Sequence, residues 1–271
     1  METIIVVIHV LMSVMETLWR VVPDGVTEIF FMMGLFVTGV VASFVNMLAG
    51  GGSMLVLGLM ILFGVDPVVA NATNRVGVLI STATGAAAYK SEKVTDIKQS
   101  LKLGLWTAPG GIAGAIFSVR ISGDLYEKIL AIVMILIVGS MFLPKRVQDN
   151  PQESGRRRWI YPAMILVGFY GGVVQVGVGI LIYGVLRHLG NMSLMRINMH
   201  RVFVVLIYII PSMGIFVWSG KINWIYAAIL CVGNAIGSWI TIKWTLKKGE
   251  KIIRIGLAVS VVLMSVKFIL F

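Results

Sequence analysis

The chain alternates between long apolar segments and short polar connections. Most apolar segments are roughly 17 to 23 residues long, which is the length that an α-helix needs to cross a ~30 Å hydrocarbon layer. We therefore predict transmembrane helices at about 3–22, 26–48, 72–89, 101–119, 125–143, 159–175, 197–218, 224–246 and 252–271. Two further apolar segments, 54–63 and 180–186, are too short to cross the layer alone.

Glycines precede both short segments. Gly50, Gly51 and Gly52 lie before the first, and Gly177 and Gly179 lie at the start of the second. A glycine break in a membrane helix leaves backbone amides and carbonyls without intrahelical partners, and lipid cannot satisfy them. These groups must face protein, water or a solute, and many transporters build a solute site from such breaks.

The composition places the chain in a membrane. It is 58% hydrophobic and only 13% charged over 271 residues, with a mean hydropathy of +0.94, which is too apolar for a soluble domain. The single cysteine, Cys231, lies in an apolar segment, so we expect no disulfide and no cysteine cluster for a metal. No nucleotide-binding loop is present, and we predict neither a metal nor another cofactor.

The net charge of +11 reflects topology and not nucleic-acid binding. Lys and Arg lie in the connections, and no basic patch with interleaved aromatic residues appears, so the predicted partner is the lipid bilayer. The hydrophilic connection 144–158 carries five basic residues and is predicted to be cytoplasmic. Counting outward places the basic connections 90–98, 187–196 and 243–251 on the same side. We predict a multi-pass protein of the inner (plasma) membrane.

The first apolar segment is predicted to be retained. A signal peptide is the alternative, but the start METII has no basic residue and no A-x-A-like site follows. We divide the chain into an N-terminal transmembrane helix (1–25), a first half (26–143), the cytoplasmic loop (144–158) and a second half (159–271).

The two halves resemble each other. The corresponding residues, with separations that drift from 129 to 123, are Asn46 and Gln175, Gly50 and Gly179, Arg75 and Arg201, and the pairs Gly110/Gly114 and Gly233/Gly237. Each half holds five segments, an odd number, so the copies must have opposite orientations in the membrane. The predicted fold class is an all-α polytopic integral membrane protein. One N-terminal helix precedes an inverted repeat of two five-segment halves with Gly-broken short or re-entrant helices. The sequence leaves open whether the segments around each break form re-entrant hairpins or full spans.

The chemistry of the spans favours an anion. An arginine inside a membrane costs ~2.5 kcal/mol or more, so Arg75 and Arg201 are expected to face a cavity or a partner near the axis that relates the halves. Their guanidinium groups suit a tetrahedral or pyramidal oxyanion. No acidic residue lies clearly in mid-span, whereas a cation transporter would be expected to have one. The alternative for both arginines is an interfacial anchor that reaches lipid phosphates.

Neutral donors complete the predicted site. Helices that begin near Asn71 and Asn198 would add amide donors and positive dipole ends, and His200 is a candidate proton carrier. Asn46 and Gln175 are alternatively interhelical hydrogen-bonding residues, and the Gly-x-x-x-Gly pairs are read as close-packing faces. The predicted substrate-binding residues are Asn46, Gly50, Gly51, Gly52, Asn71, Thr73, Asn74, Arg75, Gln175, Gly177, Gly179, Asn198, His200 and Arg201.

Three motifs carry a family resemblance. These are N-x-x-A-G-G-G at 46–52, D-P-x-x-A-N-A-T-N-R at 66–75 and Q-x-G-x-G at 175–179. Together they resemble the sulfite exporter TauE/SafE family over about 26–271, although MRINMHR (195–201) replaces the second NATNR. The resemblance implies a membrane transporter that exports sulfite, sulfoacetate or related organosulfur anions.

The predicted function is therefore a secondary transporter that exports small organosulfur anions by alternating access. An anion channel or a non-transporting membrane partner subunit is the alternative. An enzyme is not expected, because the spans contain no HExxH motif, paired carboxylates or Ser/His/Asp set. The sequence leaves open which sulfur anion is preferred, whether protons are coupled, and the oligomeric state, a homodimer included.

Overall fold

The computed structural model describes residues 24–48, 50–92, 96–126, 128–129, 132 and 157–248, and these residues form helices and no strand. The helices are α2 (Asp24–Leu48), α3 (Ser53–Leu62), α4 (Pro67–Ser91), α5 (Ile97–Arg120), the 3-10 turn η1 (Arg157–Trp159), α7 (Ile160–Val173), α8 (Val178–His188), α9 (Leu194–Trp218) and α10 (Trp224–Lys248). The all-α prediction is confirmed for this part of the chain. The predicted helices 3–22 and 252–271, most of 125–143 and most of the loop 144–158 lie outside the described residues.

Capping residues set the start of the two central helices. The Asp66 carboxylate accepts hydrogen bonds from the backbone N–H groups of Val68 and Val69, and Pro67 occupies the first turn of α4. Ser193 caps α9 in the same way. The predicted helix starts near Asn71 and Asn198 are therefore wrong. The prediction relied on where the apolar residues begin, whereas the capping residues Asp66 and Ser193 lie several positions earlier in the chain. Both asparagines lie inside their helices.

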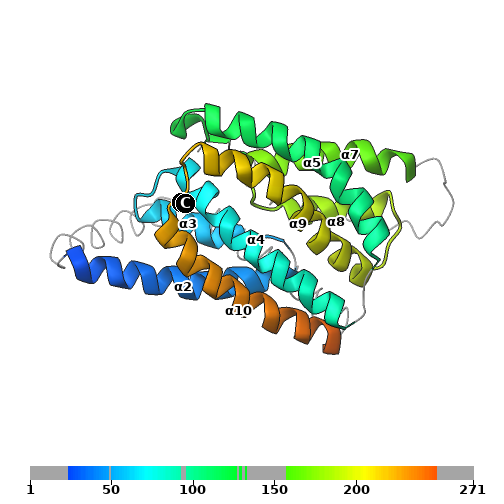
Figure 1. The fold of residues 1–271 in the computed structure, drawn as a ribbon, viewed down its shortest axis with the longest axis horizontal. Coiled ribbons are helices and arrows are strands. Elements are labelled where there is room, and N and C mark those ends of the chain that lie inside the picture. Colours follow the sequence, from blue (N-terminus) through cyan, green and yellow to red (C-terminus); the bar gives the residue numbers. More distant parts are fainter. Residues whose placement is uncertain are drawn as a thin grey trace, which may run out of the picture.

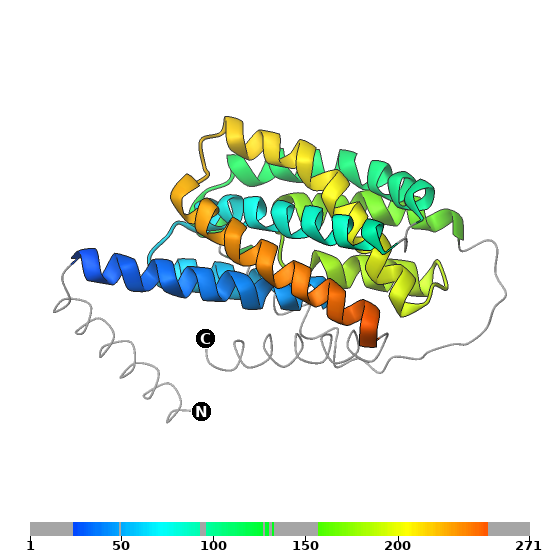
Figure 2. The ribbon, with the colours of Figure 1, turned by 60° about the horizontal axis from the view of Figure 1, so that its bottom comes forward.

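The helices form a symmetric order of neighbours (Figures 1 and 2). Helix α2 packs on α10, α10 on α4, α4 on α9, α9 on α5, and α5 on α7. Helix α3 packs on α2 and α4, and α8 packs on α7 and α9. Each of these contacts has a counterpart when α2, α3, α4 and α5 are exchanged with α7, α8, α9 and α10. Helices α4 and α9 run in opposite directions at the centre (Figure 1). This order fits a duplicated chain, and the inverted orientation of the copies stays a prediction.

The Gly-x-x-x-Gly pairs are packing faces. A Cβ atom on Gly110 of α5 would lie 2.0 Å from the carbonyl oxygen of Ile165 in α7. One on Gly237 of α10 would lie 2.3 Å from the carbonyl oxygen of Val40 in α2. The close-packing interpretation of these glycines is confirmed, because only a hydrogen atom fits between the backbones.

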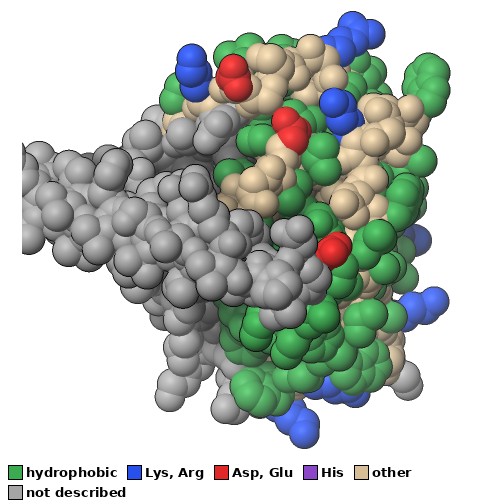
Figure 3. Space-filling view, turned by 90° about the vertical axis from the view of Figure 1, so that its left-hand side faces the viewer, with side chains coloured by type: hydrophobic (Ala, Val, Ile, Leu, Met, Phe, Trp, Pro, Cys, Tyr) green, Lys and Arg blue, Asp and Glu red, His purple; other side chains and the backbone are tan. Residues whose placement is uncertain are grey.

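The outer surface is apolar. Helix α2 over Glu28–Leu48, helix α9 and helix α10 over Trp224–Lys247 are long and apolar enough to cross a membrane. Large side chains such as Phe30, Leu166 and Ile225 are exposed. Figure 3 shows hydrophobic side chains over much of the described part of one face, with Lys and Arg toward its edges. Such a surface is expected to contact lipid.

Candidate functional site

Two breaks interrupt the helices at the predicted positions. Helix α2 ends at Leu48 and α3 begins at Ser53, with Gly50 at a φ of +84° between them. In the second half, α7 ends at Val173 and α8 begins at Val178, with Gly177 at a φ of +73°. Glycine occupies these left-handed conformations without a steric penalty, and the breaks themselves are confirmed.

The two breaks contact each other. A Cβ atom on Gly50 would lie 2.3 Å from the Cα of Gly179, and one on Gly179 would lie 2.5 Å from the Cα of Gly50. Either Cβ would also lie 2.7 Å from Nη1 of Arg201. The first and second halves therefore meet backbone to backbone, with a guanidinium group beside the contact.

Arg201 of α9 caps the broken end of α2. Its Nη1 donates to the carbonyl of Asn46 at 2.6 Å, and its Nη2 donates to the carbonyl of Met47 at 2.5 Å and to Oδ1 of Asn198 at 2.6 Å. The last carbonyls of a helix have no intrahelical partner. A residue of the second half thus satisfies carbonyls that belong to the first half.

Arg75 of α4 makes the reciprocal contact with α7. Its Nη2 donates to the carbonyls of Gly171 at 2.9 Å and Gly172 at 2.6 Å, and its Nη1 donates to Oε1 of Gln175 at 3.4 Å. The guanidinium carbon lies 4.4 Å from the centre of the Phe216 ring, which adds a cation–π contact. Each arginine therefore comes from one half and caps the broken helix of the other.

Neither arginine has an acidic partner among the described residues. The described residues form two ion pairs, Arg196 with Asp96 and Lys243 with Glu92, and both are exposed at the surface. Arg75 is fully buried and Arg201 is 4% exposed. Carbonyl oxygens carry only partial negative charge, so two buried positive charges remain without a counter-ion in the described part of the chain.

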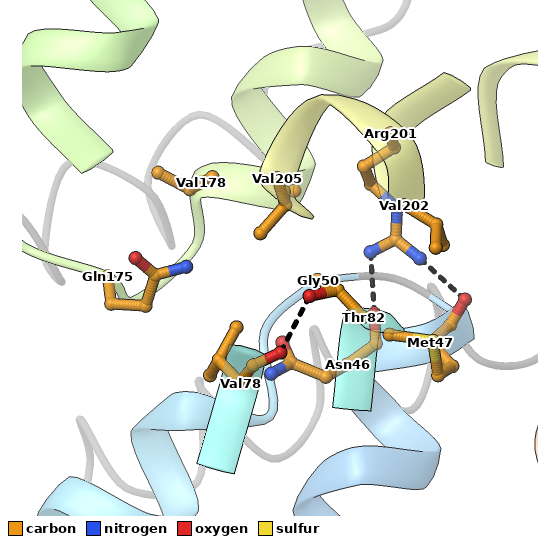
Figure 4. A pocket seen from close by; sticks show the side chains of 11 residues that line it. Asn46, Met47, Gly50, Val78, Thr82, Gln175, Val178, Arg201, Val202 and Val205 are labelled. Atoms are coloured by element: carbon orange, nitrogen blue, oxygen red, sulfur yellow. Dashed lines mark hydrogen bonds between the residues drawn. The ribbon is translucent and has the colours of Figure 1, made fainter. Parts of the chain in front are cut away.

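A cavity lies between the two breaks (Figure 4). Its volume is about 20 Å³, which is room for about one water molecule in this conformation. Helices α4 and α9 and both breaks contribute to its wall. The lining residues are Asn46, Met47, Gly50, Val78, Thr82, Gln175, Val178, Gly179, Arg201, Val202 and Val205.

Five of the predicted site residues line this cavity, namely Asn46, Gly50, Gln175, Gly179 and Arg201. The others lie elsewhere: Gly51, Gly52, Asn71, Thr73, Asn74, Arg75, Gly177, Asn198 and His200. The sequence reasoning missed several lining residues that lie at helical spacing from the two arginines and could have been predicted from that spacing. Positions 78 and 82 follow Arg75 by three and seven residues, and position 205 follows Arg201 by four, so each set shares a helix face.

Gln175 presents a donor to the cavity. Its Oε1 accepts hydrogen bonds from Arg75 and, at 3.1 Å, from the hydroxyl of Tyr208, a residue that the sequence reasoning did not select. Both contacts fix the oxygen away from the cavity, and Figure 4 shows the side-chain nitrogen pointing inward. No described residue accepts a hydrogen bond from this nitrogen. The carboxamide can therefore donate to a solute but cannot accept from it.

Asn46 holds its own break together. Its Oδ1 accepts a hydrogen bond from the N–H of Gly52 at 3.2 Å, and its Nδ2 donates to Oγ of Ser53 at 3.3 Å. Asn46 thus joins the end of α2 to the start of α3 while its side chain lines the cavity. The hydrogen bonds agree with the helix-linking interpretation, and substrate binding by Asn46 stays a prediction.

The other predicted polar residues tie helices together. Nδ2 of Asn71 donates to the carbonyl of Val173 at 3.2 Å, and Nδ2 of Asn198 donates to the hydroxyl of Tyr89 at 2.9 Å. Thr73 accepts from the N–H of Asn223 at 3.0 Å, so its hydroxyl joins α4 to the start of α10. These contacts place the three side chains between helices and not in the cavity wall.

Two further predicted residues have buried nitrogens without partners. Nδ2 of Asn74 and Nε2 of His200 make no hydrogen bond with any residue that the structure describes, while Nδ1 of His200 lies 2.8 Å from the hydroxyl of Ser100 in α5. His200 therefore faces α5 and not the cavity. Among the described residues, no group of three His, Cys, Asp or Glu side chains could hold a metal ion.

Comparisons with known proteins identify a family of membrane transporters. Residues 35–268 match the family described as "Sulfite exporter TauE/SafE". The chain is 24% identical over 237 residues to "Probable membrane transporter protein ORF9" of Sinorhizobium, covering 87% of this chain and 91% of the relative. It is 26% identical over 242 residues to "Probable membrane transporter protein YfcA" of Escherichia coli K12, covering 87% and 88%. No solved structure matches the chain.

Proposed function

The chain belongs to the sulfite exporter TauE/SafE family of membrane transporters, and on that premise we propose that it exports small organosulfur anions across the inner membrane. The candidate substrates are sulfite, sulfoacetate and related sulfonates, and the proposed mechanism is alternating access. The cavity between the two breaks is the proposed binding site.

One observation carries the anion preference. Arg201 lines the cavity, is 4% exposed, and has no acidic partner among the described residues. A buried charge is unfavourable unless it is paired, and a bound anion would supply the missing partner. A cationic substrate would instead place two positive charges in one apolar enclosure.

Further hydrogen-bond donors in the cavity wall also support an anionic substrate. The side-chain nitrogen of Gln175 points inward (Figure 4). The first backbone hydrogen bonds of α8 are donated by the N–H groups of Ile180 and Leu181. The N–H groups of Val178 and Gly179 precede them and have no carbonyl partner within the helix. Free amides and the positive dipole end at a helix N-terminus favour an anion.

The reciprocal contacts of the arginines support alternating access. Arg75 and Arg201 each hold the broken helix of the opposite half, and the cavity lies where the halves meet. A rocking motion of one half against the other would open the cavity first to one side of the membrane and then to the other, as in carriers built from repeats in general. Outward movement needs no coupling ion, because a negative interior drives an anion out by ~2.3 kcal/mol per charge per 100 mV.

Counterflow in vesicles tests the proposal. Purified protein in vesicles preloaded with unlabelled sulfite or methanesulfonate should accumulate the labelled anion transiently and saturably. Arg201→Gln should abolish this accumulation. The matched control is Arg196→Gln on the same helix, whose exposed side chain pairs with Asp96, and it should transport normally. Flux without counterflow would indicate a channel, and unaltered transport by Arg201→Gln would remove the proposed site.

A further inference from the structure

One exposed face of α5 changes from basic to apolar along the helix. Lys98, Lys102 and Trp106 lie four residues apart near its start, and all three side chains are exposed. The same face continues with exposed apolar residues, namely Leu105, Ile112 and Ile116. A molecule that lies along this face meets positive charge at one end and hydrocarbon over the rest of its length.

Helix α7 adds to the basic end of this face. Nζ of Lys102 lies 4.7 Å from the centre of the Tyr161 ring, and the Trp106 ring lies 5.5 Å from the same centre. Arg158 and Trp159 precede Tyr161 by three and two positions, and both are exposed. Helices α5 and α7 begin at the same end of the molecule, the right-hand end in Figure 1. We call this group the basic–aromatic patch, and it consists of Lys98, Lys102, Trp106, Arg158, Trp159 and Tyr161.

The basic–aromatic patch is not neutralised by acidic residues of its own helices. Helix α5 and the segment 156–175 contain no Asp or Glu. Asp96, which precedes α5, pairs with Arg196 of α9 at 3.4 Å. The other ion pair of the described residues joins Lys243 to Glu92 at the edge between α10 and α4. The patch therefore presents positive charge that no acid pairs with in the part of the chain that the structure describes.

This combination of side chains matches the boundary between headgroups and hydrocarbon. Trp and Tyr prefer the level of the headgroups in a bilayer, and Lys and Arg there attract anionic lipids. A zwitterionic headgroup would bring its own positive charge to the patch, whereas an anionic headgroup brings none. A soluble anion could pair with the basic residues but would leave the exposed apolar face of α5 unused.

We infer that the basic–aromatic patch binds the headgroup of an anionic phospholipid such as phosphatidylglycerol. Lys98, Lys102 and Arg158 pair with the phosphate, Trp106 and Tyr161 lie at the level of the glycerol, and the acyl chains follow the apolar face of α5. The lipid would bridge the start of α5, in the first half of the chain, and the start of α7, in the second. This site is separate from the cavity between the breaks and does not depend on which solute the protein carries.

Native mass spectrometry of the full chain in detergent tests the site. The wild-type protein should retain phosphatidylglycerol in preference to phosphatidylcholine. The double variant Lys98→Gln/Lys102→Gln should bind phosphatidylglycerol more weakly by about fivefold for each lysine removed, and phosphatidylcholine as before. The matched control is Lys247→Gln, which removes the charge of an exposed lysine on α10, a helix that packs on α2 and α4. It should keep the wild-type preference.

A second pair of variants separates the charge from the ring beneath it. Lys102→Arg should keep the affinity for phosphatidylglycerol, because a guanidinium group also stacks on a ring and binds phosphate. Tyr161→Leu should weaken binding by about two- to fivefold, because Lys102 loses the ring that holds it in place. Thermal unfolding in detergent without added lipid checks that each variant is folded.

Three results would overturn the inference. The first is equal binding of phosphatidylglycerol and phosphatidylcholine by the wild-type protein. The second is an equal loss in Lys98→Gln/Lys102→Gln and Lys247→Gln, which would indicate a general effect of net charge and no site. The third is binding of glycerol phosphate as tight as that of phosphatidylglycerol, which would assign the patch to a soluble phosphate compound.

Discussion

Gly50 and Gly179 touch through their backbones although 129 residues separate them, and each leaves no room for a Cβ atom beside the other. The contact joins the two helix breaks, and Arg201 lies against both glycines. The halves of the protein therefore meet at the point where their helices are interrupted, and the cavity opens beside that point.

Gly50→Ala should be strongly destabilising. The added Cβ would lie 2.3 Å from the Cα of Gly179, at a φ of +84° that alanine rarely adopts. Overpacking and backbone strain together should lower the free energy of unfolding by about 2–4 kcal/mol. The control is Gly214→Ala in α9, where nothing lies within 4 Å and alanine favours the helix. Thermal unfolding in detergent measures both variants, and equal stabilities would contradict the close contact.

Arg75→Gln should affect stability more than anion binding. The change leaves the carbonyls of Gly171 and Gly172 without their charged donor, which should cost about 2–4 kcal/mol of unfolding free energy. The anion affinity of the folded fraction should fall less than in Arg201→Gln, because Arg75 does not line the cavity. Denaturant unfolding and calorimetry on the same samples distinguish the two effects. An affinity loss equal to that of Arg201→Gln would assign Arg75 to the site.

Gln175→Glu should abolish anion binding with little change in shape. A carboxylate would take the place of a donor in the cavity wall and would pair with Arg75, so the anion would meet a like charge. The control is Gln99→Glu in the first turn of α5, which makes the same charge change outside the cavity. Calorimetry should show at least a tenfold loss for the first variant and none for the second.

Tyr208→Phe tests how Gln175 is held. The change removes one of the two donors to Oε1 and leaves the ring in the core. With only Arg75 to fix it, the carboxamide should turn more freely, and anion affinity should fall by about 3- to 10-fold, as for the loss of one neutral hydrogen bond. Unfolding in detergent provides the stability check. An unchanged affinity would mean that Arg75 alone orients Gln175.

Gly237→Ala should separate α10 from α2. The new Cβ would lie 2.3 Å from the carbonyl oxygen of Val40, so the helices must move apart at a cost of about 1–3 kcal/mol. Gly184→Ala in α8, which meets nothing within 4 Å, is the matched control. A loss of thermal stability confined to Gly237→Ala is the expected result, and equal midpoints would rule out tight packing at this face.

The sequence by itself determined the membrane setting, most helices and both breaks. Helix length follows from the number of consecutive apolar residues, and a break follows from glycines such as Gly50 and Gly177, so both are properties of neighbouring residues. The helix starts were misplaced where a polar cap preceded the apolar run, as at Asp66. The matching positions of Arg75 and Arg201 were also visible, because a duplicated chain keeps its spacing.

Only the tertiary structure decided what the two arginines do. Arg201 reaches the carbonyl of Asn46 across 155 positions and Arg75 reaches that of Gly171 across 96, so neither partner can be read from local sequence. Helix packing places Arg201 in the cavity wall and leaves Arg75 outside it, although the sequence presents them as equivalents. It also selected Tyr208 to orient Gln175. The direction of a side chain depends on which helices pack around it, and that choice is made by contacts between distant parts of the chain.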